Sequence, residues 1–173
     1  PAMRATAIVL LALLALAAPV QARDADAAFT AFLDREWDLL MQENPTWASS
    51  LGDLRWNDRL DDYSPAAQER RMRHEREALA QLQAIDPREL DEANRESHGI
   101  YLEQLQTAVD GQRFPDWLMP VNQQYSMPNN LASTLARAPL GTVRQYEDYI
   151  ARLRQVPRAM QQLQEVLAEG ARR

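Results

Sequence analysis

Apolar residues recur at spacings of three and four along most of the chain, which is the periodicity of an amphipathic α-helix. The first such segment runs from about Asp26 to Glu43, and the two-residue alternation typical of strands is almost absent. Its apolar stripe comprises Phe29, Phe32, Leu33, Trp37, Leu40 and Met41. The pattern therefore predicts an all-α fold, an irregular helical array of five or six amphipathic helices with two long loops.

Proline, glycine and capping residues mark the ends of the predicted helices. Asn44 is a candidate cap and Pro45 suits a first helical position, so a short helical turn follows, which Gly52 closes in the left-handed conformation. The segment from Asp53 to Tyr63 is the first long loop. Similar signals place further helix boundaries at Ser64-Pro65, Asp86-Pro87, Asp91 and Asp110-Gly111.

The C-terminal half contains the second long loop and the last helices. Three prolines predict an extended loop from Arg113 to Asn130, followed by a short helix at about Leu131 to Arg137. The sequence from Thr142 to Gln145 is a capping box that opens another helix. Pro157 kinks or restarts this helix, which then continues to Gly170. The helix that the capping box opens has Val143, Tyr146, Ile150 and Leu153 as the apolar residues on one side.

The N-terminus has the pattern of a secretory signal. Arg4 precedes an apolar run, Ile8 to Ala18, that is much shorter than the roughly 20 residues of a membrane span. Val20 and Ala22 supply small residues before Arg23, as at a signal-peptidase site. The alternative is a membrane anchor, against which Pro19 and the polar residues after it argue. We therefore expect residues 1–22 to be a signal peptide, without a stable anchor after cleavage, and residues 23–173 to be periplasmic or secreted.

Composition excludes several functional classes. The net charge is −6, lysine is absent, and the arginines alternate with acids, so no basic face for nucleic acid is expected. The chain contains no cysteine, which excludes disulfides, thiolate metal ligands and a cysteine nucleophile. Its two histidines, His74 and His98, are not spaced as a metal-binding pair, and neither has an evident catalytic partner.

The first loop combines acids, arginines and tryptophans. Its acids do not have the spacing of a calcium loop, so we expect them to pair with neighbouring arginines, and Asp62 to help cap the next helix. Trp47 and Trp56 are interpreted as buried anchors that pin the loop, with an aromatic platform for a ligand such as a glycan as the alternative.

The second loop contains the candidate substrate-facing residues. Asn122 and Gln123 are neutral amides in a loop that also holds prolines and aromatic residues. Such amides suit hydrogen bonding to a peptide backbone or a carboxylate. The alternative is that they satisfy the loop's own backbone groups. No catalytic residue is predicted in this chain.

Several segments, in their order and spacing, resemble the N-terminal part of the DUF885 family of bacterial proteins. In the first of these segments, the leading helix ends in an element marked by Pro45, Ala48 and Gly52. A loop from Arg55 to Leu60 follows, and it holds Trp56, Asp58 and Arg59. The other matching segments are Leu82 to Arg95, Trp117 to Gln123, and Thr142 to Gln162. The resemblance covers nearly all of residues 23–173.

The resemblance implies a mostly helical, exported protein that is longer than this chain. Family members resemble zinc metallopeptidases, carboxypeptidase-like in character, whose metal-binding His and Glu residues lie in the C-terminal part. No metal ligand can be carried over to a position of this sequence, so no cofactor is expected in this chain. We therefore expect a scaffold or cleft wall that is inactive alone and that partners with the C-terminal portion of the same protein or with another chain covering its apolar faces.

A second hypothesis from a different class stays open: a small periplasmic helical protein that binds a partner and has no enzymatic activity. The two hypotheses differ in the surfaces they predict. A portion of a larger protein should display apolar helix faces that a further portion covers. A self-sufficient binding protein should close its own core and show one defined patch.

Overall fold

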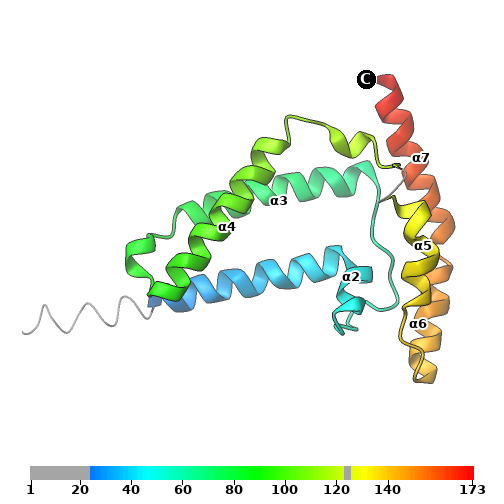
Figure 1. Cartoon of the computed structure of the whole chain (residues 1–173), viewed down its shortest axis with the longest axis horizontal. Coiled ribbons are helices and arrows are strands. Elements are labelled where there is room, and N and C mark those ends of the chain that lie inside the picture. The colour runs from blue at the N-terminus through cyan, green and yellow to red at the C-terminus, as the bar shows by residue number, and fades with distance from the viewer. Residues whose placement is uncertain (1–23, 123–125) are drawn as a thin grey trace, which may run out of the picture. The chain divides into compact units, whose positions relative to one another are not determined.

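The computed structural model describes residues 24–122 and 126–173, and this part of the chain is helical without any strand (Figure 1). The all-α prediction is therefore confirmed. The N-terminal helix covers residues 24–43. The helices after it are α2 (Pro45–Ser50), α3 (Pro65–Gln83), α4 (Glu92–Gly111), α5 (Met127–Ala136), α6 (Val143–Leu153) and α7 (Val156–Arg172), with 3-10 turns η1 (Pro87–Glu89) and η2 (Asp116–Leu118). None of the helices in these residues is both long and apolar enough to cross a membrane.

Local capping explains where these helices begin. Ser64 Oγ accepts a hydrogen bond from the Ala67 amide at 3.1 Å, with Pro65 at the first position of α3. Asp91 Oδ1 accepts from the Asn94 amide at 2.8 Å at the start of α4. The predicted capping box is present at the start of α6, where Thr142 and Gln145 bond reciprocally to each other's backbone. The restart at Pro157 is also confirmed, because this residue lies in the first turn of α7.

Two predicted boundaries are wrong. The segment predicted as extended from Arg113 to Asn130 contains η2 and the first turn of α5, which begins at Met127 instead of near Leu131. Pro128 was expected to mark a loop. It occupies the first turn of α5, where the missing N–H has no helical partner in any case.

The described residues form two compact units. The first unit contains residues 24–36 and 75–110. Its core comprises Phe29, Phe32, Ala78, Leu79, Leu82, Leu90 and Leu105. These residues come from the N-terminal helix, from α3, from the residue that follows η1, and from α4 (Figure 1). Phe29 and Phe32 are buried as the periodicity of the first helix predicts, whereas Trp37 and Leu40 of the same predicted stripe are 49% and 42% exposed. Full burial of a Phe side chain contributes about 1.5–3 kcal/mol to folding.

Polar contacts add to the core of the first unit. Asp26 accepts hydrogen bonds from the amide of Asp91 and the side chain of Asn94, both at 3.0 Å. The Tyr101 hydroxyl donates to Glu36 at 3.3 Å. Burial, together with the charge of Glu36, raises the pKa of Tyr101 to about 12.

The second unit contains residues 37–74 and the described part of 111–173. Helices α5, α6 and α7 pack together here (Figure 1). Leu135 of α5 and Ala159 of α7 form a cluster with Leu60 of the first loop, and Tyr149 of α6 packs against it. The loop is therefore held by the C-terminal helices, far from it in sequence.

Helix α6 is packed with its polar side inward. The four residues of its predicted apolar stripe, Val143, Tyr146, Ile150 and Leu153, are between 39% and 77% exposed. On the opposite side, Arg152 is 1% exposed and Asp148 is largely covered. Most surface helices bury their apolar side. The arrangement of α6 instead leaves an apolar face, here called the α6 stripe, that the described residues do not cover.

Candidate functional site

The buried side of α6 is held to the first loop and to α2 by Arg152. Its Nε donates to the carbonyl of Arg59 at 2.8 Å, and its Nη2 donates to Ser49 Oγ at 2.7 Å and more weakly to the Pro45 carbonyl at 3.4 Å. No carboxylate among the described residues lies within ion-pair distance of this guanidinium. Burial therefore lowers the pKa of Arg152, and the more distant charges of Asp61, Asp58 and Asp148 oppose that shift.

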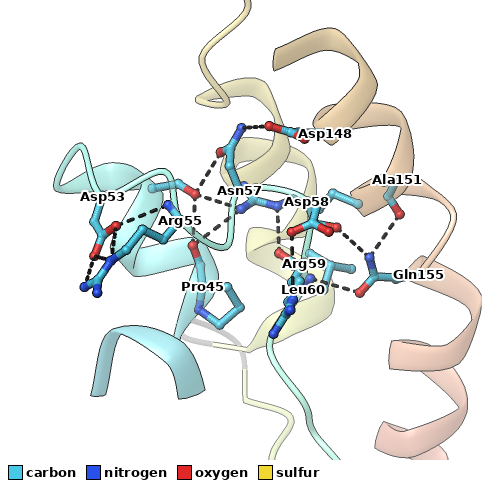
Figure 2. Close-up of polar contacts among 12 residues, drawn as sticks. Pro45, Asp53, Arg55, Asn57, Asp58, Arg59, Leu60, Asp148, Ala151 and Gln155 are labelled. Atoms are coloured by element: carbon cyan, nitrogen blue, oxygen red, sulfur yellow. Dashed lines mark hydrogen bonds and ion pairs between the residues drawn. The ribbon is translucent and has the colours of Figure 1, made fainter. Parts of the chain in front are cut away.

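Asn57 and Gln155 extend this network. Asn57 is 2% exposed, its Oδ1 accepts from Ser49 Oγ at 2.9 Å, and its Nδ2 faces Asp148 at 3.4 Å (Figure 2). The side-chain amide of Gln155 donates to the backbone carbonyl of Asp58 at 2.7 Å and accepts from the backbone N–H of Leu60 at 3.2 Å (Figure 2). Side chains of α2, the loop and the α6–α7 junction therefore satisfy one another's buried polar groups and fix the course of the loop.

Asp61 caps α2 from a distance. Its Oδ1 accepts from the Thr46 amide at 3.1 Å, and both of its carboxylate oxygens are within 2.9 Å of the Thr46 hydroxyl. Asn44, which was predicted to cap this helix, makes no side-chain cap bond there. Its side-chain amide instead donates to the Leu40 carbonyl at 2.9 Å, and so satisfies the end of the preceding helix.

The predicted pairing of the loop acids with arginines is confirmed for Asp53, Asp58 and Asp62, whereas Asp61 bonds to Thr46 instead. Asp53 and Arg55 share hydrogen bonds of 2.7–3.2 Å, and the Arg55 side chain, its main partner, lowers the pKa of Asp53. Asp62 Oδ1 accepts from the Ser64 amide at 3.0 Å, so its predicted contribution to the start of α3 is confirmed. Burial alone would raise the pKa of Asp62, but the bonds from Ser64 and the nearby arginines outweigh it and lower the pKa.

The interpretation of the tryptophans as buried anchors is wrong for Trp47. This side chain is 44% exposed, and its ring meets Trp37 edge-on with centroids 6.0 Å apart. Successive residues of a helix are rotated by about 100°, so Trp47 is turned away from the buried side that Pro45 and Ala48 occupy. Trp56 is half-buried under the Arg55 guanidinium, 4.3 Å from its ring. Polar contacts, more than indole burial, hold the loop.

A polar pocket of about 420 Å³ lies beside this network within the second unit. The end of the N-terminal helix supplies Glu43, the loop supplies Asp58, Arg59 and Asp62, α3 supplies Arg70, and α7 supplies Arg158. Pro45 and Leu60 contribute the apolar part of the lining. Its volume is within the range of small-ligand sites, although such sites are usually more apolar.

The histidines have separate structural surroundings. His98 is buried in the first unit, with Nε2 3.0 Å from the Leu82 carbonyl and its ring 5.8 Å from that of Phe29. His74 is half-buried in the second unit. Within the described residues, His, Asp and Glu side chains nowhere gather in a group of three that could hold a metal ion. The donors present in this part of the chain therefore do not fit a zinc site.

Of the two predicted substrate-facing residues, Asn122 and Gln123, only Asn122 lies within the described residues, and it is not among those that line the pocket. Asn122 is exposed, and its carbonyl accepts from the side chain of Asn129 at 3.1 Å. Gln123 lies outside the described residues, as does the predicted signal peptide, residues 1–22.

Residues 45–173 match the family model described as bacterial protein of unknown function (DUF885). The chain belongs to the DUF885 family. No curated protein and no solved structure matches it. The match begins at Pro45 and includes all of α2 to α7, so the network around Arg152 belongs entirely to the DUF885 region, whereas Glu43 of the pocket precedes it.

Sequence reasoning missed the central residues of this DUF885 site. Arg152, Asn57 and Arg158 were not singled out, because periodicity shows that α6 has a polar and an apolar side but does not show which side is buried. Pro45, Asp58, Arg59 and Leu60, which carry the family resemblance, line the pocket, although the sequence predicted no site there. They carried no information about the α7 residues that complete the pocket.

Proposed function

We propose that this chain is the exported N-terminal helical portion of a DUF885 protein and forms part of the scaffold or cleft wall of a zinc-dependent, carboxypeptidase-like peptidase. In this proposal residues 1–22 are a signal peptide, and residues 23–173 act in the periplasm or outside the cell. The chain is inactive alone. The metal ligands come from a C-terminal portion of the same protein or from another chain.

The α6 stripe is the observation that carries this proposal. Val143, Tyr146, Ile150 and Leu153 present one apolar face along the helix, while the charged Arg152 is buried on the other side. Apolar surface gains free energy by leaving water, so such a face suits a further helical portion that covers it. The donor set also supports a scaffold role, because no three His, Asp or Glu side chains of the described residues gather as metal ligands.

Co-expression with the C-terminal portion of a full-length DUF885 protein tests the proposal. We expect the two portions to co-purify, and peptide hydrolysis to require both portions and zinc. Ile150→Glu should weaken the association at least tenfold without lowering the melting temperature of the isolated chain. Arg144→Glu is the matched control, because Arg144 is 80% exposed on the same helix but outside the stripe. Peptide hydrolysis by this chain alone would contradict the proposal.

Export is tested by expressing the full chain with a C-terminal tag in a Gram-negative host. We expect the tag in the periplasmic fraction and a mature N-terminus at Arg23 by N-terminal sequencing. Replacing Leu13 and Leu14 with Arg should keep the protein uncleaved in the cytoplasm, because the apolar run is then interrupted. An uncleaved wild-type protein in the membrane fraction would favour an anchor instead.

A further inference from the structure

The arginines of the pocket have hydrogen-bonding capacity that the described residues do not use. Arg59 Nε is 3.8 Å from Asp58, and Arg70 Nη2 is 3.6 Å from Glu43 and 3.7 Å from Asp62. These separations exceed those of charge-assisted hydrogen bonds, which are about 2.7–2.9 Å. Arg158 makes no hydrogen bond or ion pair with any described residue, and acts on Asp62 only through its charge. A guanidinium carries five N–H donors and stays charged at neutral pH.

The acids of the same pocket differ in how far they are already engaged. Glu43 Oε2 accepts from Arg71 Nε at 3.1 Å. Asp62 Oδ1 accepts from the Ser64 amide and from Gln162 Nε2, the latter at 2.8 Å. Asp58 is 49% exposed, and its only carboxylate contact among the described residues is the long one to Arg59. The pocket therefore offers several unused cationic donors and one carboxylate that is still available.

The lining and volume of the pocket restrict the ligand further. Pro45 and Leu60 are the apolar residues of the lining, and both are buried. Such a surface gives little free energy to an apolar ligand. A plain anion would draw the guanidinium groups away from the acids and leave Asp58 without a partner. A ligand with both charges satisfies the donors and the carboxylate together.

We propose that this pocket binds a small zwitterion of the amino-acid or dipeptide class, with a free carboxylate and a free ammonium group. Arg70 and Arg158 bind the ligand carboxylate, and Asp58 accepts from the ligand ammonium. The pocket volume of about 420 Å³ is sufficient for a dipeptide with small side chains. This inference rests on the pocket alone and requires neither zinc nor peptide hydrolysis.

Binding is tested by NMR titration of the ¹⁵N-labelled full chain with dialanine, which carries both charges. We expect saturable shifts of the Arg Nε–H signals and of the side-chain amides of Gln42 and Gln155, which line the pocket. N-acetylalanine, which lacks the ammonium, and alaninamide, which lacks the carboxylate, should each bind at least tenfold more weakly. Equal binding of N-acetylalanine would overturn the assignment of a zwitterion, and no saturable shift with any of the three would overturn the site.

Variants locate the two charges of the ligand. Arg158→Gln should weaken dialanine binding at least tenfold and leave alaninamide binding unchanged. Asp58→Asn should weaken dialanine binding to a similar extent and leave N-acetylalanine binding unchanged. Arg154→Gln is the matched control, since Arg154 is exposed at the same α6–α7 junction but does not line the pocket. Unchanged binding by Arg158→Gln, in a variant that melts like the wild type, would contradict the proposal.

Discussion

Arg152 Nη2 donates a hydrogen bond of 2.7 Å to Ser49 Oγ, and this contact joins residues more than one hundred positions apart in the sequence. Through it the polar side of α6 is attached to α2. The Arg152 guanidinium is buried, yet its direct partners are a hydroxyl and backbone carbonyls instead of carboxylates. The cation is therefore stabilised by oriented dipoles and by acids at longer range, among them Asp61 and Asp58.

The first prediction concerns this buried cation. Arg152→Ala should lower the free energy of unfolding by about 3 kcal/mol, because the buried oxygens of Arg59 and Ser49 lose their donor. Arg152→Lys should recover part of the loss, since an ammonium keeps the charge but cannot match the planar fork. Urea denaturation measures both variants. Arg154→Ala, on the exposed side of the same helix end, is the control and should change stability by less than about 0.5 kcal/mol.

Gly52 tests the backbone of the first loop. Its φ of +88° confirms the left-handed conformation that the sequence predicts at the end of α2. Space is not the constraint there, because a Cβ at this position would meet nothing within 4 Å. Gly52→Ala should therefore lower stability by about 1–2 kcal/mol through backbone strain alone. Gly99→Ala, within α4, should be neutral or slightly stabilising in the same thermal melt. An equal response of the two variants would refute the strain argument.

Gly170 is constrained by space instead. A Cβ added there would lie 2.6 Å from the Leu118 carbonyl oxygen and 3.3 Å from the Leu118 Cβ, so η2 would have to move away from α7. Overpacking of this kind costs about 1–3 kcal/mol and outweighs the better helix propensity of Ala. Gly170→Ala should therefore melt earlier than the wild type. Its NMR shifts should change around Leu118 and not in the first unit.

Most helix starts were predictable from local chemistry, although Asn44 does not cap α2 as expected. Ser64, Asp91, Thr142 and Pro157 act at helix starts because their side chains or rings determine which backbone groups are satisfied. The outward orientation of the α6 stripe was not predictable in the same way. It depends on whether Arg152 finds acceptors in a loop about ninety residues away, and periodicity contains no such information. For the same reason the pocket, whose residues come from five separate segments, was not predictable as a site.

Stability at high pH should depend on Tyr101. Its pKa is raised from 10.0 to about 12, first by burial and then by the charge of Glu36. A group whose pKa is higher in the folded state contributes its full stabilisation of the fold at any pH below its unfolded-state pKa. This contribution is lost as the pH rises through the folded-state pKa. The melting temperature should therefore fall between about pH 10 and 12. Tyr101→Phe should fall less over this range, and parallel curves for the two proteins would contradict the assignment. Burial also raises the pKa of Tyr63, so Tyr63 accounts for the fall in melting temperature that remains in Tyr101→Phe.

Zinc binding provides a further test of the scaffold role. His98 is engaged in the core of the first unit, and neither histidine belongs to a group of three candidate ligands among the described residues. We therefore expect less than stoichiometric zinc in purified protein by elemental analysis, and no change in melting temperature with a chelator. One tightly held zinc, lost in His74→Ala or His98→Gln, would contradict this expectation.

The exposure of the α6 stripe can be tested by introducing a charge. A charged side chain changes stability little on an exposed apolar face but strongly destabilises a buried one. Ile150→Glu should change the free energy of unfolding of the isolated chain by less than about 0.5 kcal/mol, since the side chain is already 45% exposed to water. Leu163→Glu, at a buried position of the neighbouring α7, is the control and should unfold the second unit. A dye that binds apolar surface should fluoresce less with Ile150→Glu than with the wild type. A loss of several kcal/mol in Ile150→Glu would mean that the stripe is covered within this chain, and the need for a covering portion would then disappear.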